Sequence, residues 1–243
     1  MASLAAKANF RLNLRVGLIL GALVNLALVL TGILIFPTTL TADHSNGWIN
    51  VAGIILIHAV YILASFFGPL STQSIHPKAL RTGIQFGLVI SVWFAFHILF
   101  GILAPLDSDG NANLGLVEFG GLLVLFVIAG AVGMIRSGSV RGGISSAMWS
   151  SMIGTLLWFT VILLTYYLFL NTPQEVRGLQ SDQVLADFNR SGMSDLRAFI
   201  MQDYMGGGFF HMLGSPFIAA VLGGFGSLIV KGFLFVRSKI GTR

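Results

Sequence analysis

The sequence contains no cysteine and very few charged residues. The absence of cysteine excludes disulfide frameworks, iron–sulfur clusters, thiolate zinc sites and thiol redox chemistry. Charged residues make up 9% of the 243 residues, whereas a soluble domain contains about 25%, so the chain has too little charge to cover a soluble surface. Intrinsic disorder is excluded as well, because 55% of the residues are hydrophobic and the mean hydropathy is +0.87. What remains is a polytopic membrane protein.

Six long apolar stretches dominate the sequence. Each has about the 20 residues that a helix needs to cross a bilayer, and Glu118 is the only charged residue inside them. Membrane β-strands are excluded, because such strands have about 10 residues of alternating polarity. The sequence therefore predicts an all-α bundle of six transmembrane helices in a single transmembrane domain over residues 1–243, with spans at about 16–36, 49–67, 82–104, 114–135, 147–170 and 208–230.

The positions of the charged residues predict the orientation of the bundle. The segments before span one, between spans two and three, between spans four and five, and after span six hold 11 of the 14 basic residues and no acidic residue. By the positive-inside rule, both termini are predicted to be cytoplasmic, and the short loops favour a prokaryotic plasma (inner) membrane. The net charge of +5 is thus a topology signal. No nucleic-acid partner is predicted, because the basic residues are not gathered on a soluble face.

The one long connection lies between spans five and six, over residues 171–207. Two serine–aspartate pairs, at 181–182 and 194–195, are typical of helix starts, because a hydroxyl N-cap followed by an acid complements the helix dipole. Apolar residues then recur at helical spacing and predict a short amphipathic helix on the outer surface. The glycines at 206–208 are predicted to form a flexible joint into span six. Residues 181–205 are interpreted either as a lid or docking element over an external cavity, or as a linker whose apolar face rests on the helix ends.

Three polar side chains inside the predicted spans are of particular interest, because polar groups in a bilayer are costly and usually face the bundle interior. At 1.5 Å per residue, His58 lies ~14 Å below the outer end of span two, His97 ~10 Å below that of span three, and Glu118 ~6 Å into span four. Tyr61 shares a helical face with His58, and Trp93 shares one with His97. The polar faces of spans two, three and five are expected to face one another. Together they are predicted to line a polar cavity that opens outward.

Three interpretations fit the two histidines. The first is axial ligation of haem b by His58 and His97, which requires two imidazoles at similar depth on neighbouring helices. The second is a ligand site, or a proton or solute pathway, made by His58, Tyr61, Trp93, His97 and Glu118. The third is structural, with each imidazole hydrogen-bonded to a Tyr, Ser or Thr of another helix. The second and third interpretations predict no cofactor, and no metal-binding pattern of histidines is present in the sequence.

Small residues form faces on several predicted spans. Gly17, Gly21 and Asn25 lie on one face of span one, and Gly130 and Gly133 lie on one face of span four. Small residues allow helix backbones to approach closely, which is how membrane helices pack without a hydrophobic drive between them. The face of span one is predicted either to pack against another helix or to dock a partner membrane subunit.

Span six contains His211-Met-Leu-Gly214, which resembles the His-x-x-Gly element in the last catalytic helix of rhomboid intramembrane proteases, a family with six spans and cytoplasmic termini. That family carries a Gly-x-Ser-Gly nucleophile motif in its fourth span, and residues 114–135 contain no serine. Without a nucleophile beside the base, acyl transfer is excluded. The sequence also contains no His-Glu-x-x-His motif and no Walker A motif. An enzyme is therefore not favoured, and an ATP-driven transporter would need the ATPase of another chain.

In outline, the predicted chain is similar to the substrate-binding membrane subunits of energy-coupling-factor transporters, which share six helices, cytoplasmic termini and an outward-opening interior. The resemblance implies a subunit that binds a small solute or another membrane subunit and obtains its energy elsewhere. The sequence thus predicts a non-enzymatic multi-pass subunit, transport-associated or part of a larger membrane complex, in contact with lipid and with other subunits. The alternative is a haem-b-binding electron-transfer subunit.

Overall fold

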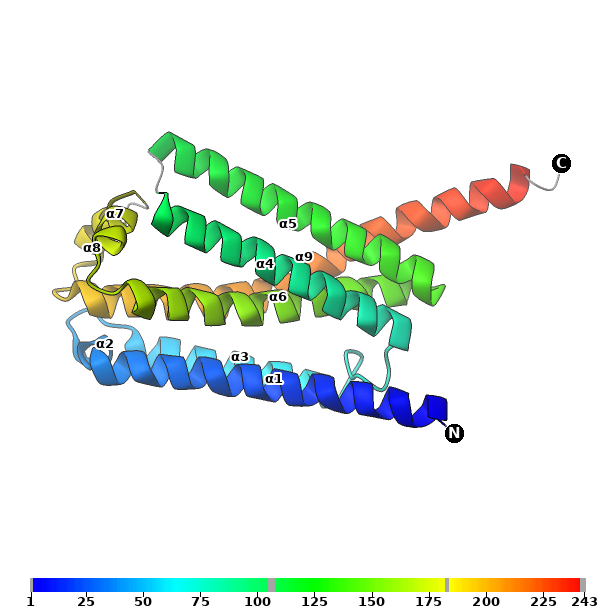
Figure 1. The fold of residues 1–243 in the computed structure, drawn as a ribbon, viewed down its shortest axis with the longest axis horizontal. Helices are drawn as coiled ribbons and strands as arrows, with labels where there is room; N and C mark the ends of the chain where they lie inside the picture. Colours follow the sequence, from blue (N-terminus) through cyan, green and yellow to red (C-terminus); the bar gives the residue numbers. More distant parts are fainter. Residues whose placement is uncertain (1, 105–107, 182–183, 241–243) are drawn as a thin grey trace.

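The computed structural model describes residues 2–104, 108–181 and 184–240, and within them all regular secondary structure is α-helical (Figure 1). Six of the helices are long and apolar enough to cross a membrane, so the predicted all-α bundle of six transmembrane helices is confirmed. The six are α1 (Ala2–Ile35), α3 (Gly47–Phe66), α4 (Pro77–Leu103), α5 (Ser108–Ser137), α6 (Val140–Phe169) and α9 (Leu196–Ile240). The short helices are α2 (Thr38–Thr41), α7 (Pro173–Ser181) and α8 (Val184–Ser191).

Large apolar side chains cover the outer surfaces of the long helices. Leu116 is 73% exposed, Val92 70% and Val221 72%. In water, a continuous apolar surface of this kind would be an aggregation site, whereas in a bilayer it contacts acyl chains and every helix satisfies its own backbone hydrogen bonds. The chain is a multi-pass membrane protein, and this apolar surface contacts lipid.

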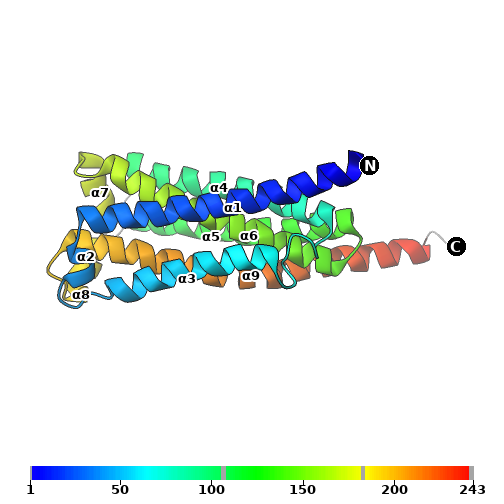
Figure 2. The same cartoon turned by 90° about the horizontal axis from the view of Figure 1, so that it is seen from below.

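Helix α6 is at the centre of the bundle. It packs against α1, α4, α5 and α9, while α5 also packs against α4 and α9. These contacts make α4, α5, α6 and α9 a four-helix core. Helices α1 and α3 lie along one side of that core, where α1 contacts α6 and α3 contacts α9 (Figures 1 and 2).

The two ends of the bundle carry different elements (Figure 1). The N-terminus and the C-terminus lie at the same end, which we call the terminal end. Helices α2, α7 and α8 lie at the opposite end, which we call the cap end. An even number of crossings explains why both termini share one end, and the positive-inside rule predicts that the cap end faces the outside of the cell.

In the terminal half of the core, glycines allow the helices to pack in direct backbone contact. A Cβ atom on Gly130 of α5 would overlap the backbone of Gly223 of α9, and one on Gly143 of α6 would overlap the carbonyl of Gly130. The buried Ser227 hydroxyl donates a hydrogen bond to the Gly130 carbonyl at 3.1 Å. These contacts are those expected of small residues between membrane helices. They leave no room for a cavity where the three helices meet.

Helix α9 differs from the prediction near its beginning. The amphipathic helix expected after residue 194 forms, but it continues without a break from Leu196 to Ile240. The flexible joint predicted at residues 206–208 is therefore wrong. Gly208 supplies a physical reason, because a Cβ atom there would overlap the ring of Phe159 on α6. The glycine permits close helix packing at this point.

The N-cap of α9 is Asp195, one residue after the predicted cap. Its carboxylate accepts hydrogen bonds from the backbone amides of Arg197 at 2.8 Å and Ala198 at 3.2 Å. A carboxylate at this position satisfies two of the amides that have no partner within the helix. The other predicted helix start, at residues 181–182, extends outside the described residues.

Candidate functional site

A cavity of about 410 Å³ lies in the cap half of the four-helix core. Helices α4, α5, α6 and α9 form its walls, and α8 contributes to its edge. Its volume falls within the ~300–1,000 Å³ of typical small-ligand pockets. The polar and aromatic side chains that line it are Phe94, His97, Glu118, Phe119, Trp158, Thr165, Tyr166, Asp187, Asp203, Tyr204 and His211.

His97 and Glu118 are in direct contact in the wall of this cavity. Nδ1 of His97 and Oε2 of Glu118 are 3.0 Å apart, and the side chains are 28% and 12% exposed. His97 precedes the C-terminal end of α4 and Glu118 follows the N-terminal end of α5, so the antiparallel pairing of these helices brings both to one level. Sequence reasoning named both residues and suggested Glu118 as a partner in a pathway. The structure pairs Glu118 with His97.

His211 is a further member of the cavity that sequence reasoning did not assign to it. The imidazole lies edge-on to the Trp158 ring, with 4.7 Å between the ring centroids. Both side chains line the same cavity as Glu118. His211 was noticed only for its resemblance to a protease element, although its place in the outer half of the last predicted span was a usable signal.

The carboxylates at the edge of the cavity come from two elements. Asp187 is on α8 and forms an ion pair with the exposed Arg190. Asp203 is on α9 and has no ion pair within the described part of the chain. Asp203 also lines a second cavity, of about 560 Å³, with Asn50 and Gly206 in its walls. No lysine or arginine is among the described residues that line the first cavity.

Tyr166 contributes an aromatic ring to the cavity wall. Its side chain is 4% exposed, and its ring lies edge-on to that of Tyr204, with 5.4 Å between the centroids. The hydroxyl oxygen is buried and makes no hydrogen bond of normal distance and angle within the described residues. The Arg197 guanidinium is the polar group that lies next to this hydroxyl.

His58 lies in different surroundings, between α1, α3 and α6. It is 1% exposed. Its Nδ1 donates to the Ile54 carbonyl at 2.7 Å, which leaves Nε2 to accept from Asn25 Nδ2 at 3.2 Å. Asn25 Nδ2 also donates to the Leu156 carbonyl at 3.1 Å, and the Thr160 hydroxyl donates to Asn25 Oδ1 at 2.6 Å. Every polar atom of the His58 and Asn25 side chains therefore takes part in this network, which favours the structural interpretation of His58.

The structure does not bring His58 and His97 together. Helix α3 packs mainly against α9 and α1 instead of α4. The two imidazoles have no hydrogen-bond or ring partner in common within the described residues. An axial haem ligand also requires a free imidazole nitrogen, whereas the Nε2 atom of His58 already accepts from Asn25. This arrangement gives no support to haem ligation by the two histidines.

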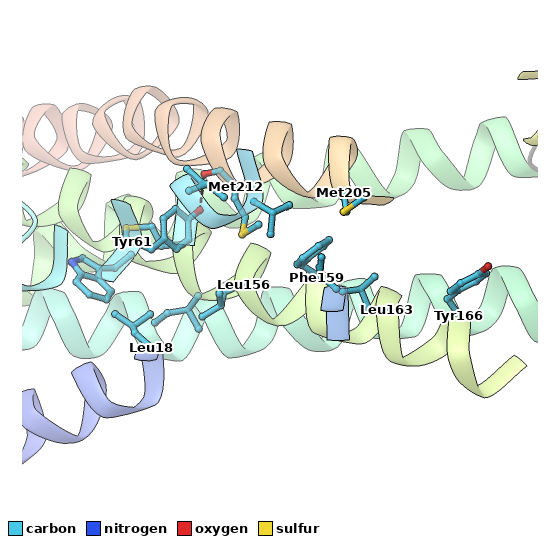
Figure 3. Packing of buried hydrophobic residues seen from close by; sticks show 14 of the residues in the cluster. Leu18, Tyr61, Leu156, Phe159, Leu163, Tyr166, Met205 and Met212 are labelled. Carbon is cyan, nitrogen blue, oxygen red and sulfur yellow. Dashed lines mark hydrogen bonds between the residues drawn. The ribbon is translucent and has the colours of Figure 1, made fainter. Parts of the chain in front are cut away.

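Tyr61 and Trp93 also lie outside the cavity lining. The Tyr61 hydroxyl donates to the Met212 carbonyl at 2.7 Å (Figure 3). It also lies 3.1 Å from the Thr155 hydroxyl. Trp93 lies against Gly121 of α5, and its buried indole nitrogen has no hydrogen-bond partner in the described chain. The polar face of α3 thus meets α6 and α9, while that of α4 meets α5. The expectation of one shared polar interior is wrong, because these faces line two separate regions.

The small-residue face of α1 faces α6 over part of its length. A Cβ atom on Gly21 would lie 2.9 Å from the Leu156 side chain, and Asn25 is fully buried. Gly17, by contrast, has no neighbouring atom within 4 Å of the position of a Cβ. Gly21 and Asn25 are therefore used in packing within the chain, and only Gly17 is open to a partner or to lipid.

Two clusters of hydrogen bonds hold the beginning of α9 to the cap end. Arg197 forms an ion pair with the buried Glu175 of α7 and donates to Asn171 Oδ1 at 2.8 Å. Gln202 accepts from the Asn46 amide at 2.9 Å and donates to the Thr39 carbonyl at 3.1 Å. The first turns of α9 are thus held by hydrogen bonds on both sides. Of the segment predicted as a lid, α8 borders the cavity and has no buried residue.

Asp195 joins these clusters through α2. The Thr38 hydroxyl donates to Oδ2 of Asp195 at 2.6 Å. This hydrogen bond, together with the two amide hydrogen bonds of the N-cap, holds the pKa of the Asp195 carboxyl below its usual value. The link connects the α1–α3 side of the molecule to the helix that lines the cavity.

The described side chains of the cavity offer an acid–base pair, further carboxylates and aromatic faces, but not a metal site. No group of three or more His, Cys, Asp or Glu among them is placed to hold a metal ion. Comparison with models of protein families, with curated proteins and with solved structures finds no significant match to this chain.

Proposed function

We propose that this protein is a non-enzymatic, transport-associated membrane subunit that binds a small solute in the cavity of the cap half. The observation that supports this most is the placement of two ionisable side chains in contact, His97 and Glu118, in the wall of a cavity of about 410 Å³. Ionisable groups inside a membrane bundle are costly, and they characteristically mark sites and pathways. In this proposal the membrane is a prokaryotic plasma membrane, which the short loops favour, and the cap end faces outward, which the distribution of basic residues supports.

The energy for transport comes from other subunits in this proposal. The chain is then the binding component of a larger membrane complex, and no Walker A motif is present in its sequence. The exposed face around Gly17 on α1 is one place where another membrane subunit could contact it, because small residues allow close helix approach.

The proposal requires water in the cavity, and the absence of cysteine makes this testable with single substitutions. His97→Cys places a thiol in the cavity, and Phe96→Cys places one at the same depth on the lipid face, where Phe96 is 63% exposed. Only a thiol in contact with water ionises and reacts with a hydrophilic thiol reagent. We expect His97→Cys to be labelled at least about tenfold faster than Phe96→Cys. His58→Cys, at a position that is 1% exposed, is expected to remain unlabelled.

The direction in which the cavity opens has its own test. Asp187→Cys on α8 is expected to react with a membrane-impermeant maleimide in intact cells. Arg141→Cys, at the exposed start of α6 at the terminal end, is expected to react only after permeabilisation. The reverse pattern contradicts the orientation, and equal labelling of residues 96 and 97 contradicts an aqueous cavity.

A further inference from the structure

The cavity carries more negative than positive charge. Three carboxylates, of Glu118, Asp187 and Asp203, line it, and no lysine or arginine is among its described lining residues. Asp187 is compensated by Arg190, and Glu118 has only a histidine as its partner. Asp203 has no ion pair in the part of the chain that the structure describes. A cation that enters the cavity would meet uncompensated negative charge.

Aromatic rings form much of the remaining wall. Trp158 contacts the Phe94 ring, with 5.9 Å between centroids, and Tyr166 contacts Tyr204 edge-on. A cation over the face of Trp, Tyr or Phe is attracted by the ring quadrupole, and desolvation strengthens this attraction. Aromatic walls together with carboxylates are the combination that recognises substituted ammonium groups.

From these observations we infer that the solute bound in the cavity is a small organic cation, with its ammonium group held between the carboxylates of Glu118 and Asp203 and the rings of Trp158, Tyr166 and Tyr204. This inference rests on the proposed function and names the chemical class of its ligand. An organic ammonium fits better than a metal ion, because no group of three or more ligating side chains is placed for a metal among the described residues. The ammonium charge competes with the His97 imidazole for Glu118.

The test compares three probes of one shape and different charge. Choline is cationic, 3,3-dimethylbutan-1-ol is its neutral isostere, and 3,3-dimethylbutanoate is the anionic counterpart. Binding is measured by isothermal titration calorimetry on the full chain in lipid nanodiscs. We expect choline to bind about tenfold more tightly than the neutral alcohol, and we expect no binding of the anion.

Carboxylate variants locate the charge that is responsible. Glu118→Gln is expected to weaken choline binding about tenfold and Asp203→Asn about threefold, because Asp203 is the more exposed. Binding of the neutral alcohol should not change in either variant. Asp43→Asn removes one carboxylate from an exposed position at the same end of the molecule and should leave both affinities unchanged. If Glu118→Gln does not fold, Asp203→Asn alone carries the test.

The outcomes separate the two proposals. Equal affinities for choline and the neutral alcohol overturn the cation assignment and leave a solute-binding cavity. Failure of all three probes to bind, with His97→Cys still reactive to a hydrophilic reagent, also overturns the cation assignment but leaves an aqueous cavity. Failure to bind together with an unreactive His97→Cys overturns both proposals.

Discussion

The region around His58 and the region around His97 contain the same kind of residue at comparable depth, but they are built in opposite ways. His58 lies in a closed contact of α1, α3 and α6, where Asn25 and the Ile54 carbonyl occupy both of its ring nitrogens. His97 lies on a cavity, where its contact with Glu118 is partly open to the space beside it. A histidine in a membrane helix is thus evidence of function only when the surrounding helices leave room next to it.

The same contrast holds for two buried tyrosines. Tyr61 is 3% exposed and its hydroxyl is bonded to the Met212 carbonyl and lies next to the Thr155 hydroxyl. Tyr166 is 4% exposed and its hydroxyl has no partner of normal geometry among the described residues. Fractional exposure therefore does not distinguish the two tyrosines. The hydrogen bonds of their hydroxyl groups do.

The largest effect is expected in the closed region, at Asn25. Asn25→Ala removes hydrogen bonds to His58, to the Leu156 carbonyl and from the Thr160 hydroxyl, and it leaves their polar atoms buried. We expect the free energy of unfolding to fall by about 2–3 kcal/mol, since each stranded buried group costs about 1 kcal/mol or more. The measurement is denaturant unfolding in detergent micelles.

Asn13 on the same helix is the matched control, because it is exposed. Asn13→Ala should change the free energy of unfolding by less than about 0.5 kcal/mol. Choline binding should be preserved in Asn25→Ala, because Asn25 does not line the cavity. If both variants are equally stable, the His58 region is not the closed structural network described above.

The two tyrosines give the next largest effect. Tyr61→Phe loses the hydrogen bond to Met212 and the contact with Thr155, so we expect unfolding to require about 1–2 kcal/mol less. Tyr166→Phe loses no hydrogen bond of normal geometry and should change stability by less than about 0.5 kcal/mol. The same unfolding measurement compares them. A larger loss of stability at Tyr166 than at Tyr61 contradicts this difference between the two hydroxyl groups.

The His97–Glu118 pair should contribute less to stability than the Asn25 network does. A double-mutant cycle with His97→Ala and Glu118→Gln is expected to give a coupling energy of about 0.6 kcal/mol, the average measured for polar pairs between membrane helices. Water in the cavity replaces part of what each side chain loses. A coupling energy above about 2 kcal/mol would indicate a structural pair and would weaken the functional interpretation of the cavity.

The six helices could be predicted from the sequence because hydrophobicity and length are local properties of each segment. Their neighbours could not, because packing depends on which faces fit together. Helix α3 follows α1 and precedes α4 in the chain, yet it contacts α9 more than α4. That arrangement separates His58 from His97, and no local pattern around either residue indicates it.

The candidate site could be predicted only in part, because it too depends on which helix faces pack together. His97 and Glu118 stood out because ionisable residues are rare in spans. Asp203 did not, since the sequence places it at the end of an external loop, before a flexible joint predicted at residues 206–208, and the structure instead continues α9 through this region. His211 lies inside the predicted span six, so its position was a signal of the same kind as that of His97. The prediction of a joint was wrong because Gly208 packs against the ring of Phe159. From the sequence alone, a glycine needed for close packing cannot be told from a glycine that makes the chain flexible.

The smallest effect concerns Asp195, which links α2 beside the closed region to α9 beside the cavity. The Thr38 hydrogen bond lowers the pKa of Asp195 in the folded state below the unfolded value of about 3.9. Its contribution to stability is therefore fully present above about pH 4 and is lost as the pH falls through the folded pKa. Asp195→Asn keeps an N-cap acceptor but no longer titrates. Between pH 6 and pH 3, the wild type should lose about 0.5 kcal/mol more than this variant in chemical unfolding, because other carboxylates titrate equally in both. An identical pH dependence in the two proteins would mean that the link between the two regions does not depend on the Asp195 charge.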